Sequence, residues 1–129
     1  MASKEPHLQY TRLYADEDGV SHFEDLEFEL SEVDFVPPAA PLLMSSPIES
    51  TRTVFFAVPA GWDGDWHPAP HRQFFVQIAG ELELKAGDGN VRRFTSGDVV
   101  LLEDTTGEGH VTRVVGDSGA RGVFVQLAE

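Results

Sequence analysis

The chain has 129 residues and no cysteine, which excludes disulfide bonds, thiolate metal sites and a cysteine nucleophile. Lysine and arginine total 9 against 22 aspartate and glutamate residues, a formal net charge of -13, so its surface on average repels nucleic acid and anionic lipid. The length and the absence of an apolar signal or membrane segment predict one domain, residues 1–129, of a soluble cytoplasmic protein.

The first elements are two strands joined by a tight turn. Residues 8–14 form the first, the turn follows at residues 16–19, and residues 22–30 alternate apolar and acidic side chains, as a half-buried strand does. The alternation puts His22 on the same face as Leu26 and Phe28, expected to point inward, which makes His22 a candidate substrate contact. A histidine at the solvent end of the strand is the simpler account.

The next segment, residues 33–50, is rich in proline. Because proline cannot continue a strand ladder, we expect a fixed, mostly extended loop across one face of the domain. Beyond it, short apolar runs alternate with glycine-rich turns at intervals of about ten residues, at residues 51–58, 81–85, 91–94, 99–102, 111–115 and 122–127. With no helical period, these runs predict an all-β sandwich or barrel of about nine strands.

Residues 61–80 carry the most informative pattern. His67 and His71 lie in the loop before an apolar strand, on which Gln73, Phe75 and Gln77 share one face. Buried glutamines need hydrogen-bond partners, so this face implies water, a ligand or a metal nearby. The other face, Phe74, Val76 and Ile78, is fully apolar and also needs cover, from a second sheet or from the partner in a homodimer.

These residues resemble the two motifs of a small cupin. Gly61, His67, Gln73 and Gly80 match the spacing of the first motif, and the turn at residues 97–98, the strand after it and His110 match the second. The resemblance implies an all-β cupin fold, a double-stranded β-helix or jelly-roll barrel. It covers residues 51–127, with the earlier strands as an N-terminal extension.

The resemblance also implies a divalent metal, which cupins typically hold with three histidines and a carboxylate. Here the second histidine falls on Ala69 and the carboxylate on Gln73. The remaining candidate ligands are His67, His110 and Gln73, with His71 as a replacement imidazole. Zinc is favoured because it accepts nitrogen-rich tetrahedral sites, and iron, manganese or nickel are alternatives.

Without a metal, the same residues suit acid–base chemistry. Two imidazoles, His67 and His110, can exchange protons near neutral pH while Gln73 orients a substrate oxygen. Trp66, Phe75 and Gln77 would contact the substrate, and Asp104 would orient the second histidine. We therefore expect a lyase, isomerase or cyclase acting on a small oxygenated molecule; an iron dioxygenase and a non-catalytic small-molecule binding or sensing module are the alternatives.

Overall fold

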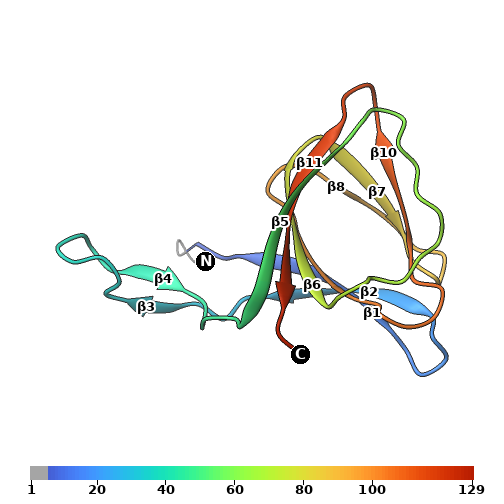
Figure 1. Cartoon of the computed structure of the whole chain (residues 1–129). Coiled ribbons are helices and arrows are strands. Elements are labelled where there is room, and N and C mark those ends of the chain that lie inside the picture. The colour runs from blue at the N-terminus through green and yellow to red at the C-terminus, as the bar shows by residue number, and fades with distance from the viewer. Residues whose placement is uncertain (1–5) are drawn as a thin grey trace, which may run out of the picture.

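The structure is a computed structural model that describes residues 6–129, and among these residues every regular element is a β-strand (Figure 1). Its strands are β1 (Gln9–Ala15), β2 (Ser21–Glu27), β3 (Ser31–Val33), β4 (Leu42–Met44), β5 (Ser50–Val58), β6 (Gln73–Ala79), β7 (Glu81–Lys85), β8 (Val91–Phe94), β9 (Val99–Glu103), β10 (Val111–Val115) and β11 (Ala120–Leu127). No helix that could cross a membrane occurs in the described part of the chain.

Two sheets form a barrel, which Figure 1 shows end-on. The larger has the order β2-β1-β9-β6-β11-β5, and the smaller has the order β10-β7-β8. Residues 62–67 lie beside β10 and extend the smaller sheet at its edge. Hydrogen bonds from Gly64 N to Thr112 O and from Val114 N to Trp62 O connect them. The expected all-β cupin-type barrel is confirmed.

The interior is packed with alternate residues of both sheets, as the strand period of two requires. The buried residues of this core include Leu13, Phe75, Leu82, Leu84, Phe94, Val100, Leu102 and Val114. A second apolar cluster, around Phe74, Leu101 and Leu127, lies on the other face of the larger sheet, and Tyr10 and Phe28 pack against it.

The N-terminal strands are part of the larger sheet, where β1 pairs in parallel with β9. The prediction of which face of the second strand points into the barrel is wrong. Phe23 packs against the core and pairs with fully buried Leu13, whereas Phe28 joins the outer cluster. Because the outer face of this sheet is also apolar, the alternation of residues 22–30 did not identify the inner side.

The proline-rich segment does not cross a face of the barrel as an extended loop. Instead, β3 and β4 pair with each other and form a hairpin that projects away from the barrel (Figure 1). Its prolines 37, 38 and 41 occupy the connection between the two strands, where no ladder hydrogen bond is needed.

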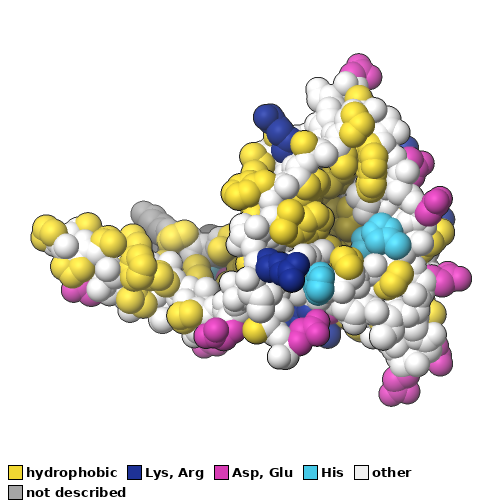
Figure 2. Space-filling model, viewed as in Figure 1, with side chains coloured by type: hydrophobic (Ala, Val, Ile, Leu, Met, Phe, Trp, Pro, Cys, Tyr) yellow, Lys and Arg dark blue, Asp and Glu magenta, His cyan; other side chains and the backbone are white. Residues whose placement is uncertain are grey.

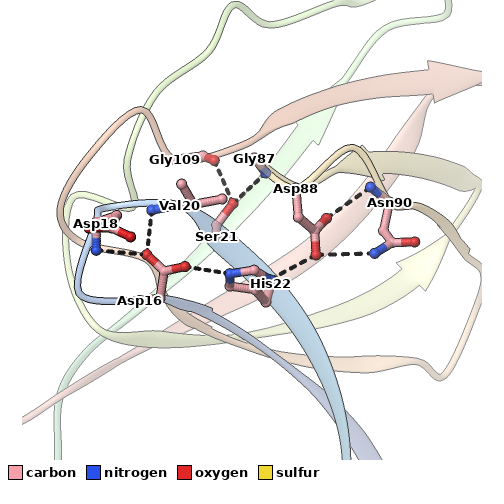
Figure 3. Close-up of polar contacts among 9 residues, drawn as sticks. All are labelled: Asp16, Asp18, Val20, Ser21, His22, Gly87, Asp88, Asn90 and Gly109. Atoms are coloured by element: carbon pink, nitrogen blue, oxygen red, sulfur yellow. Dashed lines mark hydrogen bonds and ion pairs between the residues drawn. The ribbon is translucent and has the colours of Figure 1, made fainter.

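A polar cluster holds the β1–β2 turn against the β7–β8 turn (Figure 3). His22 Nε2 donates to Asp16 Oδ2 at 2.7 Å and His22 Nδ1 donates to Asp88 Oδ2 at 2.9 Å. Since both ring nitrogens face carboxylates, which only accept, the geometry favours the doubly protonated imidazolium. His22 thus lies in a link between two turns and contacts carboxylates.

Hydrogen bonding shifts the pKa values of all three groups. The bond to Asp16, followed by the bond and charge of Asp88, raises the pKa of His22 above 6.5. The bond from His22 lowers the pKa of Asp16 below 3.8. Burial alone would raise the pKa of Asp88, but bonds from Asn90 and His22 outweigh it and lower that pKa.

These directions predict a pH window for the link. Because folding raises the pKa of His22, its protonated ring stabilises the fold fully below pH 6.5. This contribution is lost as pH rises through the folded-state pKa. The two aspartates stabilise the fold above 3.8 and lose this contribution as pH falls through their lowered pKa values. His22→Gln should therefore lower the free energy of unfolding most between these limits, and its effect should shrink at higher pH, measured by urea denaturation across pH.

A matched variant is Asp16→Asn, which keeps the Oδ1 acceptor for the backbone N–H groups of Asp18 and Val20 but removes the negative charge. It should remove most of the same pH dependence. If the pH dependence of the unfolding free energy is unchanged in both variants, the proposed stabilisation by His22, Asp16 and Asp88 is contradicted.

Candidate functional site

His67 and His110 come together from distant segments at the point where the smaller sheet closes. Each donates its backbone N–H to the other's carbonyl oxygen, at 3.1 Å from His67 and 3.0 Å from His110. Paired in this antiparallel way, the two side chains lie on one face, with ring centroids 4.8 Å apart. His110 is buried and His67 is exposed, so one imidazole lies inside the barrel and the other at its surface.

Asp104 orients the buried imidazole. His110 Nδ1 donates to Asp104 Oδ2 at 2.5 Å, and both side chains are almost fully buried, with 5% and 0% of their surfaces exposed. The other carboxylate oxygen, Asp104 Oδ1, has no hydrogen-bond partner in the described residues. A buried carboxylate with one imidazole partner holds that ring in one tautomer and stabilises it when it gains a second proton.

Both rings leave the same nitrogen available. His67 Nδ1 donates to the carbonyl oxygen of Asp65 at 2.7 Å, just as His110 Nδ1 donates to Asp104. Because a carbonyl or carboxylate oxygen can only accept, each neutral ring carries its proton on Nδ1. The Nε2 atom of each ring is then an acceptor that can take a proton from a ligand.

A small cavity of about 40 Å³ lies next to His110 inside the barrel. Its lining is otherwise mostly apolar, formed by Phe75, Leu82, Leu84, Leu102, Thr112 and Phe124. About 10–15 Å³ of such volume holds one water molecule, so the cavity accepts a group of a few heavy atoms and not a whole organic ligand. In the space-filling view, hydrophobic side chains line a hollow in the barrel and histidine lies at its rim (Figure 2).

The two glutamines have different surroundings. Gln73 is buried opposite Leu102 of β9, two residues before Asp104, and its Oε1 lacks a partner in the described residues. Gln77 lies two pleat periods further along β6 and donates from Nε2 to the carbonyl of Gly80 at 2.7 Å. Gln73 therefore lies at the end of the barrel near Asp104, whereas Gln77 holds the turn after its own strand.

Other predicted site residues lie outside the cavity lining. His71 and Trp66 are exposed on the segment before β6, and His22 belongs to the link between turns. Ala69, which occupies the position of the missing histidine, is buried in the core, and its backbone N–H donates to the carbonyl of Asp104. His71 is exposed, whereas Ala69 is buried.

Glu103 fixes the strand end from the outside. Its carboxylate accepts from Arg12 Nε on β1 at 2.5 Å and from Arg72 Nε on the segment before β6. Burial alone would raise the pKa of Glu103, but the bonds from Arg72 and Arg12 outweigh it and lower that pKa. Glu103 and Asp104 are adjacent, and they face a pair of guanidinium groups and an imidazole respectively.

Residues not anticipated from the sequence position the loop before His110. Gly109 has a φ of 76°, and a Cβ there would lie 1.9 Å from the carbonyl oxygen of His67, so only glycine permits the two segments to approach. Buried Ser21 donates from Oγ to the Gly109 carbonyl at 2.7 Å and accepts from Gly87 N (Figure 3). The glycine before the histidine was the available sequence signal, whereas the serine gave none.

The donor set does not fit a typical divalent-cation site. Within residues 6–129, no group of three or more His, Asp or Glu side chains is arranged to hold a metal ion. The candidates reduce to two imidazoles and the neutral amide of Gln73, which adds no charge to hold a cation.

Comparisons with known proteins bear on the fold alone. No family model and no curated protein matches the sequence. Among solved structures, a conserved Streptococcus pyogenes protein of unknown function is 18% identical, with a TM-score of 0.47, over 60% of this chain and 64% of that chain. The chain thus matches less than two thirds of that protein's length. Protein NMB1881 from Neisseria meningitidis is 19% identical, with a TM-score of 0.47, over 64% of this chain and 84% of that chain.

The cupin domain of Schizosaccharomyces pombe Cnp3 gives a higher score. It matches with a TM-score of 0.53 over 95% of this chain and 88% of that chain, at 12% identity. At this identity the likeness concerns backbone architecture and transfers no activity. Together with the two sheets and their closure at His67 and His110, it shows that the chain has the cupin fold.

Proposed function

We propose that this small cupin-fold protein is an acid–base enzyme that moves a proton within a small oxygenated organic molecule. The observation that supports this is the Asp104–His110–His67 arrangement. One imidazole is buried and oriented by a carboxylate, and a second lies 4.8 Å away at the surface. Isomerisation, dehydration and cyclisation of enolisable ketones or hydroxy acids are the reactions that such a pair suits.

The residues divide the work according to their burial. His110 Nε2 takes a proton from a carbon next to a carbonyl, and Asp104 stabilises the imidazolium that results. His67, exposed at the surface, exchanges protons with water and returns one to the substrate oxygen. Gln73 does not line the cavity, and these steps do not use it.

Cavity size restricts the substrate. A volume of about 40 Å³ admits the reacting end of a molecule, while the remainder lies outside, beside His67 and the exposed ring of Trp66. The same small volume favours one other candidate, a binding or sensing module that holds a small molecule without turnover. An enzyme would exchange the carbon-bound protons of a bound molecule with solvent, whereas a binding module would not.

The first test is proton exchange in D₂O, followed by NMR with small hydroxyketones and hydroxy acids as probes. His67→Ala should reduce exchange by about 10²- to 10⁴-fold, the usual contribution of a general acid–base group. Because the His67 side chain is exposed, the melting temperature of the His67→Ala variant should stay near that of the unmodified protein. His110→Gln should reduce exchange similarly, and it is preferred to alanine because it leaves a partner for Asp104.

A matched control is His71→Ala, which removes an exposed histidine on the same segment that lies outside the cavity lining. It should exchange at the unmodified rate. Binding of a probe without exchange above the buffer rate would support the binding module. Exchange at the unmodified rate in the His67 and His110 variants would contradict the roles of these histidines.

Metal content gives an independent test. Protein purified without chelator and without a nickel column should contain zinc, iron, manganese and nickel well below one ion per chain by elemental analysis. Exchange should survive dialysis against a chelator, because the proposed steps use side chains alone. A stoichiometric metal whose removal abolishes exchange would contradict the metal-free chemistry and restore the metal predicted from the cupin motifs.

A further inference from the structure

The projecting hairpin, residues 31–44, has an apolar face that its own chain leaves uncovered. We call this segment the arm. Val33 pairs with Leu42, and Phe35 lies two residues after Val33, beyond the end of β3. The exposed fractions of Val33, Leu42 and Phe35 are 38%, 44% and 60%. The acidic residues Glu32 and Asp34 alternate with them. Figure 2 shows hydrophobic side chains over the whole visible length of the arm.

A two-stranded hairpin is marginally stable by itself in water. The arm nevertheless forms a separate two-stranded sheet whose strands pair only with each other. Its exposed apolar face therefore needs a surface to pack against, and that surface must lie away from its own barrel, since the arm extends outward (Figure 1).

The outer face of the larger sheet is an apolar surface of the matching kind. Strand register aligns Phe55, Val123, Val76 and Val99 in one row across β5, β11, β6 and β9. Phe55 is 73% exposed, unusual for so large an apolar side chain. The other three residues of the row are half-buried, so the row is a partly exposed apolar surface, and contiguous apolar surfaces on a soluble protein mark interaction sites.

The row continues into an apolar groove of about 280 Å³, which we call the outer groove. Six of its lining residues are Phe28, Phe74, Val76, Val99, Val125 and Leu127. None of the residues that line it is charged, although the chain carries a net charge of -13. Two copies of so acidic a chain repel each other over most of their surfaces, and this face is where they can approach.

The arm and the outer groove are continuous in the chain. Ser45 and Ile48, which follow β4 directly, line the edge of the groove, so the arm leaves the body at the border of the surface it would fit. A twofold axis over this border places each arm across the groove of the other copy. Such an interface is self-complementary and closes after two copies.

We propose that two copies of this chain associate by reciprocal exchange of their arms, with Val33, Phe35 and Leu42 of each arm packed into the outer groove of the other copy. The larger sheets then face each other and cover the row that ends at Phe55. This inference is independent of the proposed chemistry, since neither His67 nor His110 takes part.

The solution mass tests the association. Light scattering after gel filtration should give twice the chain mass of 14.2 kDa. Leu42→Glu places a charge in the apolar contact and should weaken self-association at least about tenfold, since an unpaired buried charge is costly. Glu32→Gln, on the opposite face of the same arm, should leave the dimer intact. A monomer, or equal effects of the two variants, overturns the proposal.

Disulfide cross-linking tests where the arm lies. The chain has no native cysteine, so only the introduced thiols can react. A tagged Leu42→Cys chain is mixed with an untagged Val76→Cys chain and oxidised. A disulfide-linked heterodimer should form in greater yield than with Lys85→Cys, an exposed position on the smaller sheet. Yields equal to this control overturn the proposal, and so does an intramolecular bond in a chain carrying both Leu42→Cys and Val76→Cys.

Discussion

The closure of the barrel at His67 and His110 is the interaction on which the site depends. Two reciprocal backbone hydrogen bonds bring the segment before β6 against the start of β10, and the same pairing places both imidazoles on one face. The approach needs a residue without a side chain at Gly109, where any Cβ would meet the backbone of His67. Architecture and chemistry are thus set by one contact, and the link through Ser21 supports it from the N-terminal strands.

Most of the barrel could be predicted from the sequence because its signals are local. Strands such as Glu81–Lys85 and Val111–Val115 coincide with their expected bounds, since apolar alternation and glycine turns determine them directly. The pairing of His67 with His110 followed from motif spacing, which records a contact between distant segments. Asp104 was expected beside the second histidine because it is close in sequence, and the structure places it there.

What could not be predicted depends on long-range packing. His22 was placed on the inner face because the sheet was assumed to have one apolar side, whereas Phe23 faces the core and Phe28 the outer cluster. The proline-rich segment gave no strand signal, so the arm was missed. The parallel pairing of β1 with β9 and the hydrogen bond from Ser21 to Gly109 also leave no local trace in the sequence.

The central claim is that a carboxylate and a carbonyl hold the two facing imidazoles with Nε2 free. Long-range nitrogen–proton NMR correlations on the ¹⁵N-labelled protein distinguish the two neutral tautomers of each histidine directly. In their neutral state His67 and His110 should both carry their proton on Nδ1, and Asp104→Asn should disturb this state in His110 alone. A neutral His110 protonated on Nε2, or rings that average freely between tautomers, would contradict it.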